Sequence, residues 1–566
     1  MKIKFLLSVF GGVLVLVCPL RNAFAQSAEA VTCSSLVKFQ APNVTITTAE
    51  FEDAPYSLPG ADTKIAKSFC RVVGFLTPTS DSRIGFEVWL PVAADWNHKF
   101  VAVGNGGFTG SVNVRGMLPG FDRGYAAMAT DYGHLNPPSN PVEDVTWAYG
   151  HPEKFIDYAY RAEHLSALVS KQIIAAYYNA APAHSYYTGC SAGGIHGMTE
   201  MLRYPTDFDG YIIGDGLPDH LGQEVGQFWY TMVVSSLANP TEAFQPSQIS
   251  LVHDAVLKQC AGKDGGVSTD KFLSNPEACK FDPKTLQCAA GEDSSTCLSA
   301  AQVEALKKVY SGPPVDPVTH KQILPAYTPG SEATWDRYIS GKKNPVGTER
   351  PWAGFMADVA MADPDYLTKE RYLTFNFGTD LAAVRKRMIA GETLDAVFNT
   401  SSRDLDPIKT EGAKVIHYHG WDDPNNPPLD AVNFFQSVVA DQAQRHHLTS
   451  QQALKETQQF YRLFMVPGMG HCLGGAGPNV FGQNYARSIK DDAEDDTLTA
   501  LEVWVESGSA PDQFIGSHVD AKTGSVDMTR PICAYPKVPT YTGSGSTNDA
   551  ANFVCADKPQ SQHISK

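Results

Sequence analysis

A serine at the centre of a short glycine-flanked motif is the strongest chemical signal in the chain. The motif G-C-S-A-G spans residues 189–193 and places Ser191 in the middle of G-x-S-x-G. Residues 185–188 before it are typical of a strand, and residues 195–202 after it are typical of a helix. A sharp strand-to-helix turn would lift the serine hydroxyl above a sheet, and the helix N-terminus would favour developing negative charge. This context favours a nucleophilic serine over a chance match.

A nucleophilic serine needs a neighbouring base, and the base needs an acid that orients it. On folds that use G-x-S-x-G, the acid and then the histidine follow the serine along the chain. Asp422 and Asp423 follow a strand-like segment at 414–418, and His471 follows another at 460–466. We therefore predict His471 as the base and one of the two adjacent aspartates as the orienting acid.

Other histidines are weaker candidates for the base. Asp131 and His134 could pair with each other, but both precede the serine, which is the wrong order for this fold. His446, His447 and His518 lie in polar segments, where exposure to solvent is the simpler expectation.

A negatively charged acyl-transfer intermediate needs two backbone N–H donors. Ala192, directly after the serine, is predicted to supply one of them. The run G-N-G-G at 104–107 follows a strand-like segment and would supply the other from an early loop. An ordinary glycine turn is the alternative interpretation of this run.

These residues must be positioned by a sheet, and the sequence predicts one. Strand-like and helix-like segments alternate from about 71 to 216, which is typical of an α/β fold with a parallel sheet. The clearest segments are strands at 86–90, 100–103, 126–130 and 211–213, a long helix at 155–178, and a closing helix at 500–507. Residues 217–400 contain few strand-like runs and are richer in Pro, Gly and Trp. We interpret 26–216 and 401–566 as the catalytic core and 217–400 as an inserted lid domain.

The N-terminus is typical of a secretory signal peptide. Lys2 and Lys4 precede an apolar run at 5–17, and Ala-Phe-Ala at 23–25 fits a cleavage site. The run is short for a membrane span. We therefore expect residues 1–25 to be removed and the mature protein to be secreted or periplasmic. A lipid anchor on Cys18 is a less favoured alternative, because valine precedes it.

Ten cysteines remain in the mature chain, and an even number in an exported protein indicates disulfides. Spacing suggests four pairs: Cys33–Cys70, Cys260–Cys279, Cys288–Cys297 and Cys533–Cys555. Cys190 and Cys472 remain, each beside a proposed catalytic residue. A bond between them would tie the serine turn to the histidine loop, whereas two buried free thiols are the alternative.

Composition narrows the classes of partner. The chain has 566 residues and a formal net charge of −16, with 45 basic and 61 acidic residues. This balance argues against nucleic acid and against anionic membrane surfaces. A hydrophobic fraction of 43% excludes extended disorder.

Three motifs together resemble the tannase/feruloyl esterase family, which also includes mono(2-hydroxyethyl) terephthalate hydrolase. They are G-C-S-A-G at 189–193, H-G-W-D-D-P at 419–424 and V-P-G-M-G-H-C at 466–472. The resemblance implies an α/β-hydrolase core with a large lid, and a Cys190–Cys472 disulfide. It implies Ser191, His471 and Asp423 as the catalytic triad, with N–H donors from Ala192 and Gly107.

The resemblance also bears on calcium. Many members hold a structural calcium in an aspartate-rich lid loop, but here Ala261 stands where the first aspartate is expected. Only Asp264 and Asp270 remain as carboxylate ligands, and Lys263 adds repulsion. We expect catalysis to need no cofactor and regard calcium in this loop as disfavoured.

The resemblance further implies that lid aromatics contact the substrate. Trp352 and Phe355 lie in the corresponding stretch, with ordinary lid core as the alternative. Where the terephthalate-monoester hydrolase uses an arginine, this chain has Pro351, with Arg350 one residue earlier. A preference for terephthalate esters is therefore not expected.

The resulting hypothesis is a secreted serine carboxylic ester hydrolase acting on small esters of hydroxycinnamic or gallic-type acids. A serine peptidase of the same fold would share the triad and remains an alternative. A non-catalytic binding protein on the same scaffold is the other alternative, although no triad member is missing. The sequence leaves the oligomeric state open.

Overall fold

The computed structural model describes residues 32–58, 64–235, 244–293, 295–337, 351–400 and 402–557. The predicted signal peptide at 1–25 lies outside these ranges. Within them, no helix combines the length and the apolar character that crossing a bilayer requires.

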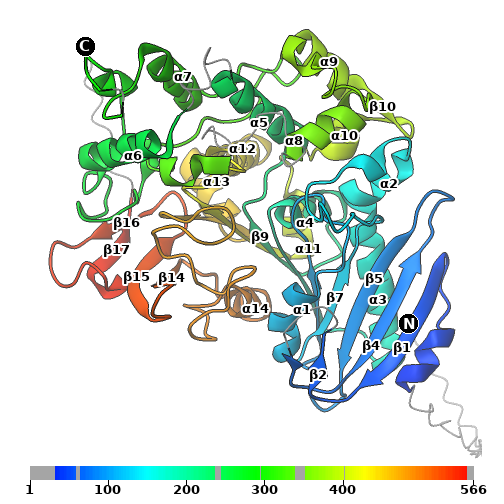
Figure 1. Ribbon diagram of the computed structural model, residues 1–566. Helices are drawn as coiled ribbons and strands as arrows, with labels where there is room; N and C mark the ends of the chain where they lie inside the picture. The colour runs from blue at the N-terminus through cyan, green and yellow to red at the C-terminus, as the bar shows by residue number, and fades with distance from the viewer. Residues whose placement is uncertain are drawn as a thin grey trace, which may run out of the picture.

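A nine-stranded sheet organises the molecule (Figure 1). Its strands in spatial order are β1 (Val44–Glu52), β4 (Phe69–Leu76), β5 (Ile84–Pro91), β7 (Ala126–Thr130), β6 (Lys99–Val103), β8 (His184–Cys190), β9 (Gly210–Gly214), β12 (Lys414–Gly420) and β13 (Tyr461–Val466). The six strands from β7 to β13 are parallel, and β1, β4 and β5 add an antiparallel edge. The predicted α/β class with a parallel sheet is confirmed.

The sheet is buried on both faces because its strands carry apolar residues at successive positions. Side chains alternate between the faces, so neighbours on one strand enter different cores. One core contains Ala102, Tyr187 and Ile213, and the other contains Val103, Tyr186 and Ile212.

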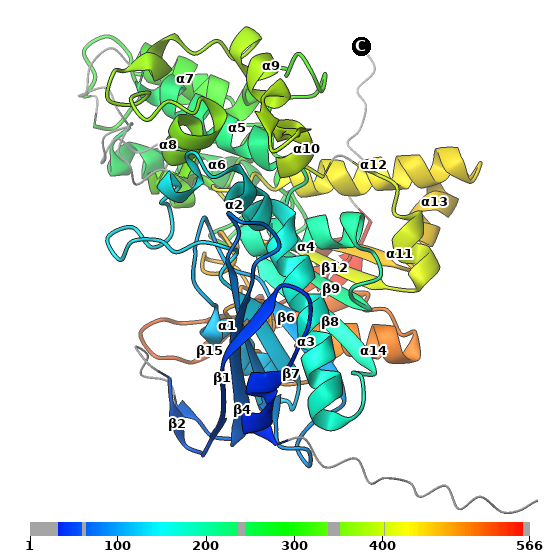
Figure 2. The ribbon, with the colours of Figure 1, turned by 90° about the vertical axis from the view of Figure 1, so that its right-hand side faces the viewer.

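Helices cover both faces of the sheet. The first core is closed by α3 (Ala162–Tyr178), α4 (Ala192–Arg203) and α12 (Leu429–Arg445), and the second by α1 (Val114–Asp122) and α14 (Thr497–Ser507). Figure 2 shows α3 and α4 running along the sheet. The predicted helix at 155–178 is continuous in course but not uniform, since a π-helical turn at 157–161 joins α2 (Pro152–Ile156) to α3.

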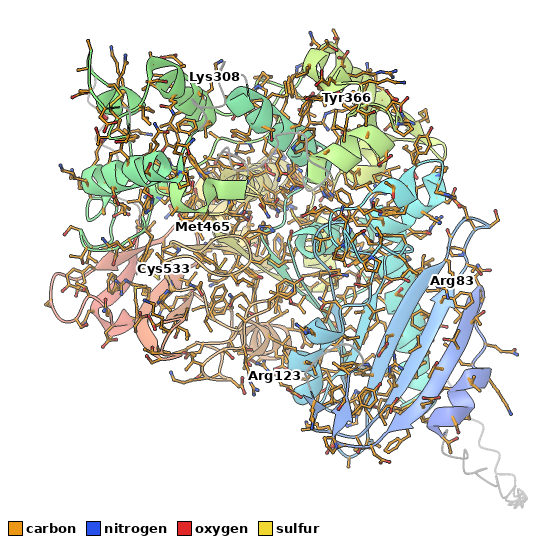
Figure 3. All side chains as sticks on the ribbon, in the orientation of Figure 1. Arg83, Arg123, Lys308, Tyr366, Met465 and Cys533 are labelled. Carbon is orange, nitrogen blue, oxygen red and sulfur yellow. A yellow bond between two sulfur atoms is a disulfide. The ribbon has the colours of Figure 1, made fainter. Side chains whose placement is uncertain are left out.

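Where the structure describes it, the chain between β9 and β12 contains helices and turns with two strands of two residues each, which agrees with the few strand-like runs in its sequence. Its elements are α5 (His220–Ser235), α6 (Pro246–Cys260), α7 (Ala300–Ser311), α8 (Pro351–Gly354), α9 (Thr379–Lys386), β10 (Met388–Ile389), β11 (Glu392–Thr393), α10 (Leu394–Phe398) and α11 (Asp406–Glu411). Part of this insertion has its own core around Val252, Leu306 and Trp335. Other parts share a core with the sheet: Tyr366 of the insertion belongs to the same core as Met465 on β13, and Figure 3 labels both residues.

The remaining α-helix and paired strands are small. They are α13 (Ser450–Thr457) and the paired strands β2 (Tyr56–Ser57) with β3 (Lys64–Ile65), β14 (Gln513–Val519) with β15 (Val526–Cys533), and β16 (Val538–Tyr541) with β17 (Phe553–Ala556). All five predicted disulfides are present, including the one between Cys190 and Cys472.

Candidate active site

Three loops that leave the carboxyl ends of parallel strands form the candidate active site. Ser191 follows β8, Asp423 lies three residues after β12, and His471 lies five residues after β13. Because these strands are parallel and lie close together in the sheet, their following loops meet at one edge. Residues far apart in the sequence are brought together in this way.

The turn at Ser191 has the strained geometry expected of a strand-to-helix elbow. Ser191 has a positive φ of 63° and immediately precedes α4. A side chain at Gly189 or at Gly193 would collide with backbone, with a Cβ only 2.5 Å from Gly193 O or 2.8 Å from Asn105 O respectively. The flanking glycines are therefore required by close backbone approach.

The predicted triad residues are in hydrogen-bond contact. His471 Nε2 lies 2.7 Å from Ser191 Oγ, and His471 Nδ1 lies 2.8 Å from Asp423 Oδ2. The other oxygen of Asp423 accepts the backbone N–H groups of Asn425 and Asn426, at 2.7 and 3.0 Å. These two bonds fix the carboxylate in the direction of the imidazole ring.

Electrostatics within the triad favour an ion pair between the acid and the histidine. Burial of Asp423 opposes its ionisation, but His471 and His419 beside it hold the pKa of this carboxyl well below its usual range. Burial also opposes protonation of His471, yet the adjacent Asp423 carboxylate raises the pKa of the imidazole above its ordinary value. The histidine can therefore hold a proton taken from the serine.

Asp422, the other candidate acid, does not contact His471. It is buried, and burial raises its pKa well above the usual range, while His253 and Glu332 of the insertion act on its charge. The order of the motifs along the chain did not show whether Asp422 or Asp423 is the orienting acid. The contact between Asp423 and His471 favours Asp423.

Ala192 and Gly107, the two residues predicted to supply oxyanion N–H donors, line the same cleft as Ser191 and His471. Ala192 is the first residue of α4, so its N–H has no acceptor within the helix. Gly107 lines the same cleft with a φ of 56°, and a Cβ there would lie 2.7 Å from Val142 Cγ1. Asp131 and His134, in contrast, do not line the cleft, and His134 stacks on Trp147 at 3.7 Å.

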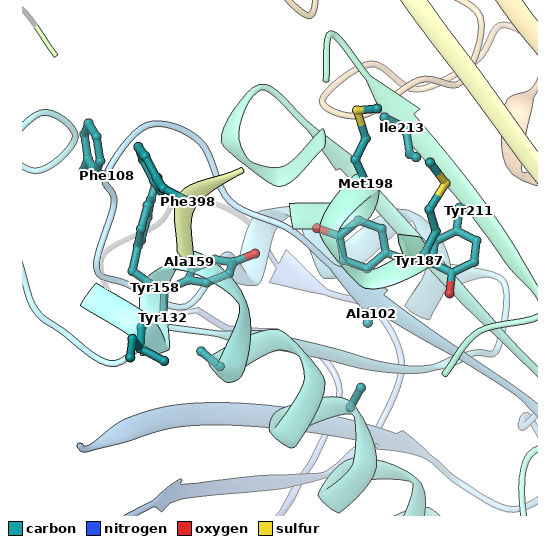
Figure 4. Close-up of a cluster of buried hydrophobic side chains, with 14 of the residues drawn as sticks. Ala102, Phe108, Tyr132, Tyr158, Ala159, Tyr187, Met198, Tyr211, Ile213 and Phe398 are labelled. Atoms are coloured by element: carbon teal, nitrogen blue, oxygen red, sulfur yellow. The ribbon is translucent and has the colours of Figure 1, made fainter. Parts of the chain in front are cut away.

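The cleft has a volume of about 350 Å³, within the range of small-molecule sites. Apolar walls come from Phe108, Val142 and Ile195, while α5 contributes His220, Gln223 and Glu224. Phe108 is backed by Tyr158, which lies beside Phe398 in Figure 4. The α5 residues were missed from the sequence, because nothing in their spacing shows that this helix reaches the serine.

The aromatic residues expected to contact the substrate are placed elsewhere. Trp352 and Phe355 are fully buried and do not line the cleft. Trp352 stacks on Phe228 at 4.6 Å, and Phe355 stacks on Phe398 at 5.2 Å. Both residues therefore belong to the core of the lid, which was the alternative interpretation, because other aromatic side chains already cover their rings. Arg350 lies outside the described residues.

The lid loop considered for calcium has its carboxylates engaged by the protein. Asp264 accepts backbone N–H groups from Gly266, Ser274 and Asn275. Asp270 forms a buried ion pair with Arg530 at 3.0 Å. Calcium needs six to eight oxygen ligands, and a guanidinium beside Asp270 opposes a second cation. These residues therefore do not fit a calcium ion.

The chain is similar to known proteins along most of its length. Residues 70–556 match the family model described as tannase and feruloyl esterase. An uncharacterized esterase from Xanthomonas campestris pv. campestris is 34% identical, over 95% of this chain and 93% of that protein. A probable feruloyl esterase B-1 from Aspergillus oryzae is 31% identical, over 86% of this chain and 84% of that protein.

A solved structure extends the likeness to three dimensions. Feruloyl esterase B from Aspergillus oryzae superposes with a TM-score of 0.80 and 27% identity, covering 93% of this chain and 99% of that one. The α/β-hydrolase fold with its large insertion is therefore shared along nearly the whole length. The chain belongs to the tannase and feruloyl esterase family and is a carboxylic ester hydrolase.

Proposed function

We propose that this protein is an exported serine esterase that hydrolyses esters of phenolic aromatic acids, of the hydroxycinnamic or gallic type, through an acyl-enzyme. The observation that carries the proposal is the continuous contact from Ser191 Oγ through His471 to Asp423. The names of the relatives support the substrate class, since two of them are feruloyl esterases.

The reaction follows from the positions of these atoms. Ser191 Oγ attacks the ester carbonyl carbon while His471 Nε2 takes the hydroxyl proton. The N–H groups of Ala192 and Gly107 stabilise the oxyanion. The tetrahedral intermediate expels the alcohol, which receives the proton from His471. Water then attacks the acyl-enzyme with His471 as base, and this second step releases the acid and restores Ser191.

Asp423 stabilises the imidazolium that forms in both steps. Only neutral His471 can accept the serine proton, so activity declines as pH falls through the pKa of this histidine. That pKa is raised by Asp423, so the acidic limb of the pH profile is expected above the ordinary histidine value of about 6.5.

The cleft suits an aromatic acid that carries hydroxyl groups. Phe108 and Ile195 offer apolar surface for a ring, and the side-chain oxygens of Gln223 and Glu143 offer acceptors for phenolic O–H groups. The acidic side chains Glu143 and Glu224 do not favour a free substrate carboxylate. This is consistent with a preference for phenolic esters over terephthalate monoesters.

A substrate panel tests the proposal. Methyl ferulate, methyl gallate, mono(2-hydroxyethyl) terephthalate and a peptide anilide should be compared by kcat/KM for wild type and Ser191→Ala. We expect either phenolic ester to exceed the terephthalate ester and the peptide by at least about tenfold, with Ser191→Ala nearly inactive. Preferential cleavage of the peptide would favour a serine peptidase and overturn the proposal.

Export is supported by the N-terminal segment and by the five disulfides, since disulfides persist in oxidising compartments. Expression of the full chain in a bacterium, followed by N-terminal sequencing, tests it. We expect mature protein beginning at Gln26 in the periplasm or medium. Uncleaved protein confined to the cytoplasm would contradict export.

A further inference from the structure

A second carboxylate lies beneath the triad, and the mechanism above does not use it. Asp215 directly follows β9, the strand between those that carry Ser191 and Asp423, and it is completely buried. Its Oδ1 accepts the backbone N–H of Gly420 at 2.8 Å, and its Oδ2 accepts the backbone N–H of Cys472. One side chain thus bonds both the end of β12, where the loop that carries Asp423 begins, and the loop that carries His471.

The backbone around Asp215 makes two further connections. Its carbonyl oxygen accepts the side-chain amide of Asn426, whose own N–H is one of the two donors to Asp423. The carbonyl of Gly214 accepts the N–H of Ser191 at 3.0 Å. All three loops that carry the triad are therefore hydrogen-bonded to residues 214 and 215.

The charge of Asp215 also acts on the triad. The groups that face it are Tyr418 and His419 on β12, Asp423 in the loop that follows β12, and His471. His419 Nε2 lies 3.8 Å from Asp215 Oδ1 and 3.5 Å from Asp423 Oδ2. Although burial opposes its charge, these two carboxylates raise the pKa of His419 to about 9.

A protonated His419 would disfavour an imidazolium at His471, and the negative charge of Asp215 opposes that effect. Burial raises the pKa of Asp215 itself to about 6, so the group is mainly ionised at neutral pH. The positive charge of His419 offsets the negative charges of Asp215 and Asp423, and this explains why two carboxylates can lie so close to His471.

We propose that Asp215 is a positioning residue for the esterase reaction: it holds the loops that carry Asp423 and His471 in register, next to the Ser191 turn, and supplies a second negative charge that stabilises the imidazolium of His471. The inference rests on the proposed function, because it assumes that His471 cycles between neutral and protonated forms. Asp215 itself touches no substrate and transfers no proton.

The test compares Asp215→Asn with Asp209→Asn, using 4-nitrophenyl acetate and methyl ferulate across pH 5 to 9. Asp209 lies at the other end of β9, where its carboxylate is exposed and bonds the N–H of Ser185. We expect Asp215→Asn to lower kcat at least about tenfold with KM changed less than about twofold. Its acidic limb should move to lower pH by about half a unit, because His471 loses a stabilising negative charge.

The position of the acidic limb separates charge from packing. A merely structural role would lower kcat and leave the limb where it is in the wild type. Asp215→Glu keeps the charge and serves as the second variant. It should retain the wild-type limb with reduced kcat, and it stays informative if Asp215→Asn does not fold.

The outcomes distinguish this inference from the function on which it rests. If folded Asp215→Asn had the kcat and the pH profile of the wild type, the inference about Asp215 would be overturned and the proposed function would stand. A lowered kcat with an unmoved limb would overturn the electrostatic role. An Asp215→Glu protein that folds but has the acidic limb of its pH profile displaced to lower pH would also overturn the electrostatic role. If the wild type hydrolysed neither ester, the proposed function would fall, and this inference with it.

Discussion

The loops at the carboxyl edge of the sheet and the insertion between β9 and β12 differ in how they fix their side chains. At the sheet edge, Ser191, Asp423 and His471 meet because each follows a parallel strand. In the insertion, the family resemblance made Trp352, Phe355, Asp264 and Asp270 candidates, and each is engaged in packing or pairing within the protein. Strand ends determine position in the first region, and packing partners distant in sequence determine it in the second.

The largest effect should come from separating the two adjacent aspartates. Asp423→Asn removes the acceptor of the His471 Nδ1 proton and favours the wrong tautomer, so we expect kcat to fall about 10³- to 10⁴-fold. Asp422→Asn, the matched control, should change kcat less than about threefold, because Asp422 makes no contact with His471. Steady-state kinetics on methyl ferulate measure both, and equal losses would contradict the assignment.

The disulfides offer a paired test between the same two regions. Cys190–Cys472 spans 282 residues at the site, whereas Cys288–Cys297 spans nine residues in the insertion. On a loop-entropy account, replacing both cysteines by alanine should cost about 5 kcal/mol of unfolding free energy in the first case and about 2.5 in the second.

Activity should separate the two bridges more sharply than stability does. Loss of Cys190–Cys472 loosens two triad loops, and we expect kcat at 25 °C to drop at least about tenfold in folded protein. Loss of Cys288–Cys297 should leave kcat within about twofold. Equal kcat in both variants would show that the Cys190–Cys472 bridge does not position the site.

Trp352 tests the assignment of lid aromatics to the core. Because Trp352 is fully buried against Phe228 and does not line the cleft, Trp352→Ala should destabilise the fold by about 3–5 kcal/mol. The KM for methyl ferulate should stay within about twofold in protein that remains folded. A large rise in KM with unchanged chemical denaturation would place Trp352 in the substrate site.

Metal removal should have the smallest effect. The carboxylates of Asp264 and Asp270 are satisfied by backbone N–H groups and by Arg530, so chelation should change neither the melting temperature nor kcat. Thermal unfolding with EDTA and with added calcium measures this, and a melting temperature that falls in EDTA and recovers with calcium would contradict it.

The contrast between strand ends and distant packing partners also explains which parts of the fold and the site could be predicted from the sequence. The alternation of strand-like and helix-like segments before residue 216 predicted the sheet. The order serine, acid, histidine predicted the triad, because motifs that follow parallel strands lie at the same edge of the sheet. The choice between Asp422 and Asp423 needed the family motif or the geometry, since both follow the same strand by similar distances.

Other parts of the site depended on distant packing. Gln223 and Glu224 on α5 line the cleft, and the hydrophobic periodicity of this segment does not indicate that. Asp215 had a usable signal, because it follows the strand predicted at 211–213, at the sheet edge where the three triad loops begin. The partner of Asp270, Arg530, lies 260 residues away, so the ion pair could not be inferred from the loop itself.

Covalent labelling tests whether Ser191 is the nucleophile. A fluorophosphonate should react once per molecule, and peptide mapping by mass spectrometry should locate the adduct on Ser191, in step with loss of ester hydrolysis. His471→Gln should label far more slowly, because the serine then lacks its base. An active enzyme whose adduct lies on another residue, or whose ester hydrolysis survives complete labelling of Ser191, would contradict the account.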